Sequence, residues 1–348
     1  SKNLESRIKN IYLNPEKREN YLLNSTIKGI EESDCIFLIG SNPRYEGTIL
    51  NSRIRKSYLK NKTKIFSLNN IGDQTYPYES LDGKTENIKK IVENNHPISE
   101  EIKKSNRPIV LIGQSALQAN SGKYIFESIK AFLIKNNKIT DKWNALNVMS
   151  QNASTVGSFD LGIYNLSEDR NKVLKKINDN YFDIIYFLGQ DNLKFKKKNE
   201  FIIYQGSHGD RGAEMADIIL PGAAYTEQDG LYTNLEGKIQ KAFKASFPPG
   251  EAKEDWIIIN ELAEKIGEKK FFNNKNELEN SMMNYLKLFN EKNSSNTTNN
   301  LIDTNFIDET IQLDDIDYYY SNVIARSSKT MSECRNQKIN LKSTGTEG

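Results

Sequence analysis

Short apolar runs that end in glycine recur along this chain of 348 residues, and they limit its fold more than any other feature. Four such runs occupy residues 36–40, 109–113, 184–189 and 201–206. Short runs rich in β-branched and aromatic side chains and closed by a turn residue are typical of strands buried in a parallel sheet. The sequence therefore predicts several buried parallel strands.

Segments with helical spacing lie between these runs. The apolar positions of three expected helices are Leu50, Ile54 and Tyr58; Ile125, Ile129 and Phe132 or Leu133 within residues 121–135; and Val173, Leu174 and Ile177 within residues 168–179. Each set falls on one face of a helix. Two more expected strands, at residues 64–68 and 146–149, each follow one of these helices. Strands that alternate with helices predict a doubly wound α/β fold with mostly parallel sheets and Rossmann-like βαβ units.

The pattern changes after residue 216. A short strand is stopped there by Pro221-Gly222, and residues 231–240 predict a hairpin that turns at Glu236-Gly237, with Gly230 and Gly237 permitting tight turns. A helix that ends at Gly267 follows. Its apolar side is expected to carry Trp256, Ile259, Ala263 and Ile266.

These patterns divide the chain into four expected regions. Residues 1–215 form an α/β domain, and residues 216–270 form a strand–hairpin–helix segment packed on the same domain. Residues 271–315 are a variable linker region with an amphipathic stretch at 278–289. Residues 316–348 are a polar C-terminal tail, either disordered or laid along a partner.

Charge and the scarcity of metal ligands weigh against several functional classes. There are 48 Lys and Arg against 46 Asp and Glu, so the net charge of +2 gives no basic footprint for nucleic acid. The two cysteines, Cys35 and Cys334, are too few for an iron–sulfur cluster, and the two histidines are His96 and His208. We therefore expect no metal site built by this chain. No apolar run approaches the ~20 residues of a membrane-spanning helix.

Two glycine-containing turns are candidate ligand sites. Gly40-Ser41-Asn42-Pro43 follows a strand and opens a helix, a place that favours phosphate, but Ser and Asn are common caps and we interpret the turn as a cap. Gly206-Ser207-His208-Gly209-Asp210-Arg211-Gly212 places an imidazole near a carboxylate, as acid–base chemistry requires. We interpret it as a loop whose glycines supply positive φ angles and whose charges pair locally. The fingerprint G-x-G-x-x-G is absent after these strands, so direct NAD binding is not expected. No catalytic, cofactor-binding or metal-binding residue is assigned.

Residues 216–240 carry a recognisable signature. They read Ala-Asp-Ile-Ile-Leu-Pro, then Glu227 and Gly230, then Asn-Leu-Glu-Gly-Lys-Ile-Gln. This segment closely resembles the A-D-x-x-L-P and N-x-E-G-R-x-Q segments of molybdopterin oxidoreductases, with Lys238 where arginine is usual. The turn at residues 40–43 resembles the G-x-N-P loop of the same family.

Other segments resemble one branch of that family, the C-terminal half of the large 75-kDa-type iron–sulfur subunit of respiratory complex I. They are residues 42–46, 51–57, 115–118, 203–210, 221–227, 248–250, 254–256, 324–334 and 346–348. The resemblance spans almost the whole chain, and residues 270–315 depart from it most.

The resemblance implies a structural, non-catalytic role in the NADH-oxidising peripheral arm of complex I, on the matrix side of the inner mitochondrial membrane or on the bacterial cytoplasmic face. It implies that the catalytic pterin is absent and that the iron–sulfur clusters lie in the other half of the subunit, in a partner polypeptide or in another part of a longer chain. Other subunits of the arm are the expected partners. We expect residues 12–21 and 318–326 to contact them. The alternatives are part of a molybdopterin-dependent oxidoreductase such as a formate dehydrogenase, and a free-standing nucleotide-binding module.

Overall fold

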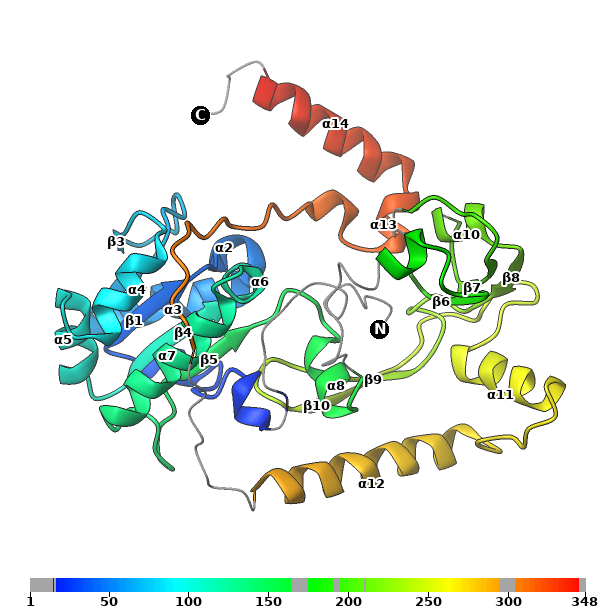
Figure 1. Cartoon of the computed structure of the whole chain (residues 1–348), viewed down its shortest axis with the longest axis horizontal. Coiled ribbons are helices and arrows are strands. Elements are labelled where there is room, and N and C mark those ends of the chain that lie inside the picture. Colours follow the sequence, from blue (N-terminus) through cyan, green and yellow to red (C-terminus); the bar gives the residue numbers. More distant parts are fainter. Residues whose placement is uncertain are drawn as a thin grey trace.

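The computed structural model describes residues 15, 17–163, 175–190, 195–209, 211–294 and 304–343. Two parallel sheets lie at opposite sides of the molecule, and an antiparallel hairpin lies between them (Figure 1). The predicted α/β class, with mostly parallel sheets and a small hairpin, is confirmed.

The first sheet has five strands in the order β3-β2-β1-β4-β5, and every neighbouring pair is parallel. The strands are β1 (Cys35–Ile39), β2 (Lys64–Ser67), β3 (Glu79–Ser80), β4 (Pro108–Gly113) and β5 (Leu146–Met149). The central strands β1 and β4 are buried at every position, because a hydrophobic core lies on each side of the sheet. All of these strands except β3 were predicted, and β3 was missed because its two residues are polar and exposed.

Helices connect the strands of this sheet, and one more, α8, follows its last strand. They are α2 (Pro43–Glu46), α3 (Thr48–Asn61), α4 (Thr85–Val92), α5 (Pro97–Lys104), α6 (Gln114–Gln118), α7 (Gly122–Lys135) and α8 (Thr155–Asp160), preceded by the 3-10 turns η1 (Arg18–Asn20) and η2 (Gly29–Glu32). The predicted apolar stripe of α7 is fully buried, as are Leu50 and Ile54 of α3. The helix expected to begin at Pro43 breaks at Gly47, which separates α2 from α3.

The second sheet contains β6 (Ile184–Leu188), β7 (Phe201–Gly206) and β8 (Ile218–Pro221), all parallel, in the order β6-β7-β8. The short helix α10 (Arg211–Met215) connects β7 to β8, so the sheet runs across residue 215. One face packs into a core cluster with Ile177, the described residue of the expected third helical stripe. Val173 and Leu174 lie outside the described residues.

Complete burial of this second sheet was expected from its apolar runs, and that expectation is wrong. Its strands β6 and β8 are largely exposed or half-buried. The runs resemble those of the first sheet in composition, but the described helices leave much of one face of this sheet uncovered.

The hairpin consists of β9 (Gly230–Thr233) and β10 (Ile239–Ala242), with Gly237 at φ +82° in the turn, as predicted. Gly230 does not supply a positive φ, so its expected role in a tight turn is wrong. The helix α11 (Asp255–Lys265) ends before Gly267, which has φ +88°. Its buried residues are Ile258, Asn260 and Ala263, and the placement of Ile266 on the buried side is wrong because that residue is exposed.

The rest of the chain is helix and extended backbone. It comprises α12 (Lys275–Ser294), the 3-10 turn η3 (Tyr318–Tyr320), α13 (Val323–Ser327) and α14 (Lys329–Ser343). Residues 304–315, expected to belong to a variable linker, run as extended chain along the first sheet's domain, where Ile311 is buried. The expected match at residues 346–348 lies outside the described residues, as do residues 12–14 and 16 of the expected N-terminal contact. None of the described helices is long and apolar enough to cross a membrane.

Candidate functional site

The turns after β1 and β4 interlock. Gly40 has φ +58°, and a Cβ atom there would lie 2.5 Å from the backbone nitrogen of Ala116. A Cβ atom on Gly113 would overlap the carbonyl oxygen of Gly40. These glycines are therefore required for close packing of the chain against itself, and the packing fills the space beside the Gly40 turn.

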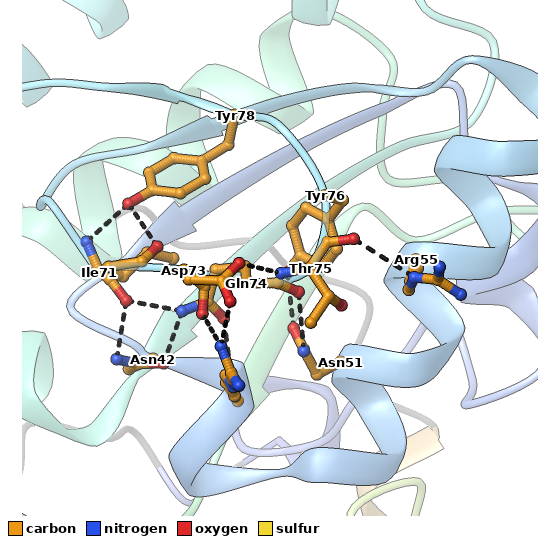
Figure 2. Close-up of polar contacts among 11 residues, drawn as sticks. Asn42, Asn51, Arg55, Ile71, Asp73, Gln74, Thr75, Tyr76 and Tyr78 are labelled. Carbon is orange, nitrogen blue, oxygen red and sulfur yellow. Dashed lines mark hydrogen bonds and ion pairs between the residues drawn. The ribbon is translucent and has the colours of Figure 1, made fainter. Parts of the chain in front are cut away.

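Asn42, the residue before α2, does not cap the helix with its side chain, so the interpretation of this turn as a side-chain cap is wrong. Its Nδ2 instead donates to the carbonyl oxygen of Ile71 (3.1 Å). Its Oδ1 accepts a hydrogen bond from Nε2 of the buried Gln74 (3.0 Å), as Figure 2 shows. Asn42 thus fixes the loop that follows β2, because loop partners satisfy both ends of its amide.

Arg44 and Asn51, from the recognised segments 42–46 and 51–57, hold the rest of this loop. Figure 2 labels Asn51 and the loop residues. Nη1 of Arg44 donates to the carbonyl oxygen of Asp73 (2.6 Å) and to its Oδ2 (2.7 Å). Asn51 donates to the carbonyl oxygen of Gln74 (3.1 Å) and accepts from the hydroxyl of Tyr76 (2.7 Å). The pKa of Asp73 is lowered, first by the amide of Thr75 and then by Arg44. The motif residues of α2 and α3 thus clamp a loop of their own chain.

At the start of α2 the side chain of Glu46, and not that of Asn42, accepts a hydrogen bond from the backbone. Its Oε1 accepts the backbone amide of Asn42 (2.6 Å), and its Oε2 is buried with no hydrogen-bond partner. The pKa of Glu46 is raised to about 7, chiefly by burial and to a smaller extent by the nearby Asp314, while Asn42 and Gln151 oppose the shift. The raised pKa thus reflects the burial of a carboxyl group that holds the backbone at the start of α2.

The hairpin turn that carries the N-x-E-G signature is also a clamp. Its Gly237 carbonyl accepts from Nη2 of Arg18 (2.7 Å), and Oε2 of Glu236 accepts the backbone amide of Ile27 (3.0 Å). The backbone amide of Leu23 donates to the carbonyl of Leu235 (2.8 Å). The signature turn therefore fixes the segment that precedes β1.

The glycine-rich loop after β7 differs from its predicted conformation. Gly206, Gly209 and Gly212 are not in the left-handed region, so the expectation of positive φ angles is wrong. A Cβ on Gly206 or Gly212 would instead strike the ring of Tyr204, whose hydroxyl donates to the carbonyl of His208 (2.9 Å). Nδ1 of His208 lies 3.0 Å from Oγ of Ser207, and Asp210 lies outside the described residues.

The structure keeps the other potential ligands of a metal ion apart. Cys35 is buried in β1, where burial raises the pKa of its thiol to about 12, and Cys334 is exposed on α14. His96 caps α5, since its Nδ1 accepts the amide of Ile98 (3.2 Å). In the part of the chain that the structure describes, no three His, Cys, Asp or Glu side chains are grouped to hold a metal ion.

A cleft of about 570 Å³ is lined by segments that follow β5 of the first sheet and β6 and β7 of the second. In open α/β sheets ligands bind outside the carboxyl ends of the strands. Its lining comes from the segment after β5 (Gln151, Asn152, Ala153, Ser154), the turns after β6 and β7 (Gly189, Gln190, Ser207), the loop residues Tyr225 and Thr226, the hairpin region (Tyr232, Ala242, Phe243, Ala245) and the tail (Ser321, Asn322, Val323, Arg326). Among these side chains are amides, hydroxyls and one guanidinium, but no carboxylate, thiol or imidazole. The described lining can hold a polar group by hydrogen bonds, and Tyr225 and Tyr232 are its side chains of a type that can transfer a proton.

Sequence reasoning did not find this cleft. Of the turns singled out by sequence, the one after β7 contributes Ser207, while Gly40 and Asn42 are not among the lining residues. The remaining residues come from segments far apart in the chain, and Gln151, Tyr225 and Arg326 share no local pattern. The rule that ligands bind at the carboxyl ends of parallel strands was the one available signal.

Comparison with known proteins identifies the family. The family model of molybdopterin oxidoreductases matches residues 1–265. The NADH-ubiquinone oxidoreductase 75 kDa subunit of Reclinomonas americana is 36% identical over 92% of this chain and 47% of its own length. A subunit of the NADH-quinone oxidoreductase of Rickettsia bellii is 36% identical over 96% of the chain and 48% of its own length. The mitochondrial NADH-ubiquinone oxidoreductase 78 kDa subunit of Candida albicans is 32% identical over 91% of this chain and 45% of its own length.

The chain thus spans about half the length of the curated relatives that it matches. The matched family model covers the first sheet, the second sheet, the hairpin and α11. The two turns recognised in the sequence, at residues 40–43 and 234–237, lie within it and clamp neighbouring segments of the same fold. The chain belongs to the molybdopterin oxidoreductase family.

Proposed function

We propose that this chain is the molybdopterin-oxidoreductase-like portion of the large subunit of a respiratory NADH:ubiquinone oxidoreductase, and that it serves as a structural, non-catalytic part of the peripheral arm. The observation that carries the proposal is 32–36% identity over more than nine-tenths of the chain to 75- and 78-kDa-type subunits and their bacterial counterpart. A mitochondrial location on the matrix side goes with this role, as does a partner polypeptide that supplies the iron–sulfur half.

The motif geometry supports a structural role. Both recognisable turns use their polar atoms to hold neighbouring backbone, at Ile71 through Asn42 and at Ile27 through Glu236. Polar groups satisfied within the protein are less available for a substrate, because each has already exchanged water for a protein partner. The motifs therefore support a role in maintaining the shape of the domain.

The residues at the cleft do not fit the pterin cofactor after which the family is named. That group is anionic through its phosphate, and anion sites use several cations or free backbone amides. Among the described lining residues Arg326 is the one cation, and it belongs to a tail segment that itself lines the cleft. The Gly40 turn is packed against Gly113 and Ala116. We propose accordingly that the chain carries no pterin. We propose also that it carries no iron–sulfur cluster, because its two cysteines, one buried in β1 and one on α14, are fewer than the four thiolates such a cluster uses.

Native electrophoresis of membranes from cells that express the tagged chain tests the proposal. The tag should co-migrate with the band that stains for NADH dehydrogenase activity, and mass spectrometry of that band should identify further NADH dehydrogenase subunits. Metal analysis of the isolated chain should find no stoichiometric molybdenum or iron. A tagged chain that migrates apart from the active band, or one that carries molybdenum, would overturn the proposal.

A further inference from the structure

One face of the three-stranded sheet is apolar and largely uncovered. Ile184 pairs with Phe201 on β7, and Ile203 pairs with Ile218 on β8. Paired residues of parallel strands share a face, and alternate residues of one strand do too. By this register one face, here called the open face, carries Ile184, Tyr186, Leu188, Phe201, Ile203, Gln205, Ile218 and Leu220, of which only Gln205 has no apolar body and is fully buried.

The two faces of β6 and β7 differ sharply in exposure. On the open face Ile184 is 63% exposed and Phe201 43%, and Ile218 on β8 is 46% exposed. On the other face Phe187 is 5% exposed, Tyr204 2% and Ile202 0%, and all three belong to one core cluster. The edge strand β8 is exposed on this face too, since Ile219 beside Tyr204 is 53% exposed. The strands β6 and β7 therefore have one face in a core and one face toward solvent.

Such an arrangement is unfavourable for a parallel sheet. Parallel sheets occur almost always with both faces covered, usually by helices, because their strands are apolar on both sides. Among the described residues, Gln205 at the carboxyl-terminal end of this face is covered, and its Nε2 donates to Oδ1 of Asp255 at the start of α11 (2.9 Å).

The open face continues into an apolar groove. The groove has a volume of about 270 Å³ and meets the open face at Leu188. Its apolar lining includes Leu231, Ile239, Met282 and Leu286, from the hairpin and α12. None of the open-face residues is charged. A contiguous uncharged surface of this kind marks an interface with another protein segment.

We propose that the open face is the docking surface for an amphipathic helical layer from the polypeptide that corresponds to the remaining half of the relatives. The chain matches 47% and 48% of the length of two relatives, so each contains a further region of comparable size. In those proteins that region is covalently joined to the part that matches this chain, which keeps the two regions adjacent. The inference rests on the proposed function and adds the place of contact.

Site-specific photo-crosslinking in the assembled complex tests the contact. Ile184→p-benzoylphenylalanine and Ile218→p-benzoylphenylalanine probe the open face, and Ile49→p-benzoylphenylalanine, at an exposed site on α3, is the matched control. We expect adducts from positions 184 and 218 to map by mass spectrometry to a polypeptide homologous to the relatives' other half, and adducts from position 49 to map elsewhere. Adducts that join two copies of this chain, adducts to another segment of this chain, or no adduct would each overturn the inference.

A charge on the open face gives an independent measure. The double variant Ile184→Glu/Ile218→Glu should fold normally, because both side chains are well exposed in the chain alone, but it should reduce the assembled fraction at least about tenfold. Ile49→Glu should assemble like the wild type. If the wild-type chain itself is absent from the complex, the proposed function fails. If the wild type assembles and the double variant assembles equally well, the docking surface alone is refuted.

Discussion

Arg18 and Asp160 form a bidentate ion pair, with Nε of Arg18 2.9 Å from Oδ1 and Nη2 2.8 Å from Oδ2 of the aspartate. The carboxylate is buried and also accepts the hydroxyl of Tyr21 (2.8 Å). The same Nη2 reaches the carbonyl of Gly237 in the hairpin turn. One guanidinium therefore joins the segment before β1, the end of α8 and the signature turn.

Replacing Arg18 should be strongly destabilising. Arg18→Ala leaves the Asp160 carboxylate buried without its cation, which costs about 3 kcal/mol of unfolding free energy. Arg53→Ala is the control, because Arg53 pairs with Glu31 at a more exposed site and its loss should cost about 1 kcal/mol or less. Urea unfolding monitored by circular dichroism measures both. Equal losses in the two variants would contradict the importance of the buried pair.

The interlocked turns predict a large difference between two glycine substitutions. Gly113→Ala would place a Cβ against the Gly40 carbonyl, so backbone has to move, at a cost of about 2–4 kcal/mol. Gly209→Ala is the control, since a Cβ there meets nothing within 4 Å and the residue has no positive φ. Thermal unfolding should show a clearly lower midpoint for the first variant alone. A Gly113→Ala protein with the wild-type midpoint would show that the turns are not tightly packed.

The strands and the main helical stripes could be predicted because local sequence determines most of their burial. Residues 36–40 and 109–113 carry β-branched residues closed by glycine, and both became fully buried central strands. The same signal failed on the open face, because whether a strand's second side is buried depends on what covers it. Ile184 and Ile36 look alike in sequence and differ completely in exposure.

The clamps and the cleft could not be predicted for a related reason. Asn42 follows a strand and precedes a proline, which favours a capping role, and its actual partners lie in a loop with no periodic pattern. Arg18 and Asp160 are 142 residues apart and carry no local mark of their pairing. Ile311 lies in an acidic stretch that looks like a linker, yet its backbone bonds to Gly83. Each of these contacts depends on tertiary structure alone.

Glu46 predicts an unusual dependence of stability on pH. Its pKa is about 7 in the folded chain against an ordinary 4.5, so its contribution to stability is complete below pH 4.5 and is lost as pH rises through 7. Glu46→Gln removes the titration and keeps an acceptor for the Asn42 amide. At pH 8 the variant should be more stable than the wild type by about 1–3 kcal/mol, and the gap should close near pH 4.

Unfolding free energies of the two proteins across this pH range test the prediction. Asp73 supplies a control of opposite sign, because its lowered pKa makes its charged form stabilising at neutral pH. Asp73→Asn should therefore be less stable than the wild type near pH 7, and the difference should shrink in acid. If the unfolding free energy of the Glu46→Gln protein changes with pH as that of the wild type does, the explanation by a buried carboxyl group is contradicted.

Gln74 is the buried centre of the loop clamp in Figure 2. Its Nε2 donates to the carbonyl of Ile71 (2.6 Å) and to Oδ1 of Asn42, and its Oε1 accepts the amide of Arg44 (3.3 Å). Gln74→Ala removes the partner of Oδ1 of Asn42 and of the Arg44 amide, while the Ile71 carbonyl keeps Nδ2 of Asn42, and the change should cost about 1–3 kcal/mol. Amides of residues 70–76 should exchange hydrogen faster, whereas those of β4 should not. Unchanged exchange in the loop would show that Asn42 and Arg44 hold it without Gln74.

The C-terminal region should divide into a part that belongs to the fold and a part that is available for assembly. Residues 304–315 lie on the first domain, where Thr85 donates to the carbonyl of Glu309 (2.9 Å) and Asn69 to the carbonyl of Ile311 (2.8 Å). Deletion of 304–348 removes the buried Ile311 side chain and these bonds, at a cost of about 3 kcal/mol or more. Deletion of 316–348 spares them and should leave the α/β core folded.

Circular dichroism and urea unfolding of the two truncated chains separate these effects from assembly. Ile311→Ala should reproduce much of the larger deletion's loss, and Ile307→Ala, at an exposed neighbouring site, should not. The shorter deletion still removes Tyr318, whose hydroxyl donates to the carbonyl of Tyr45 (2.6 Å), together with the cleft residue Arg326. It should therefore weaken co-migration with the NADH dehydrogenase band while the chain stays folded. If the chain that lacks residues 316–348 assembles at wild-type levels, the tail contributes nothing to partner binding, and the contacts would have to come from the α/β body.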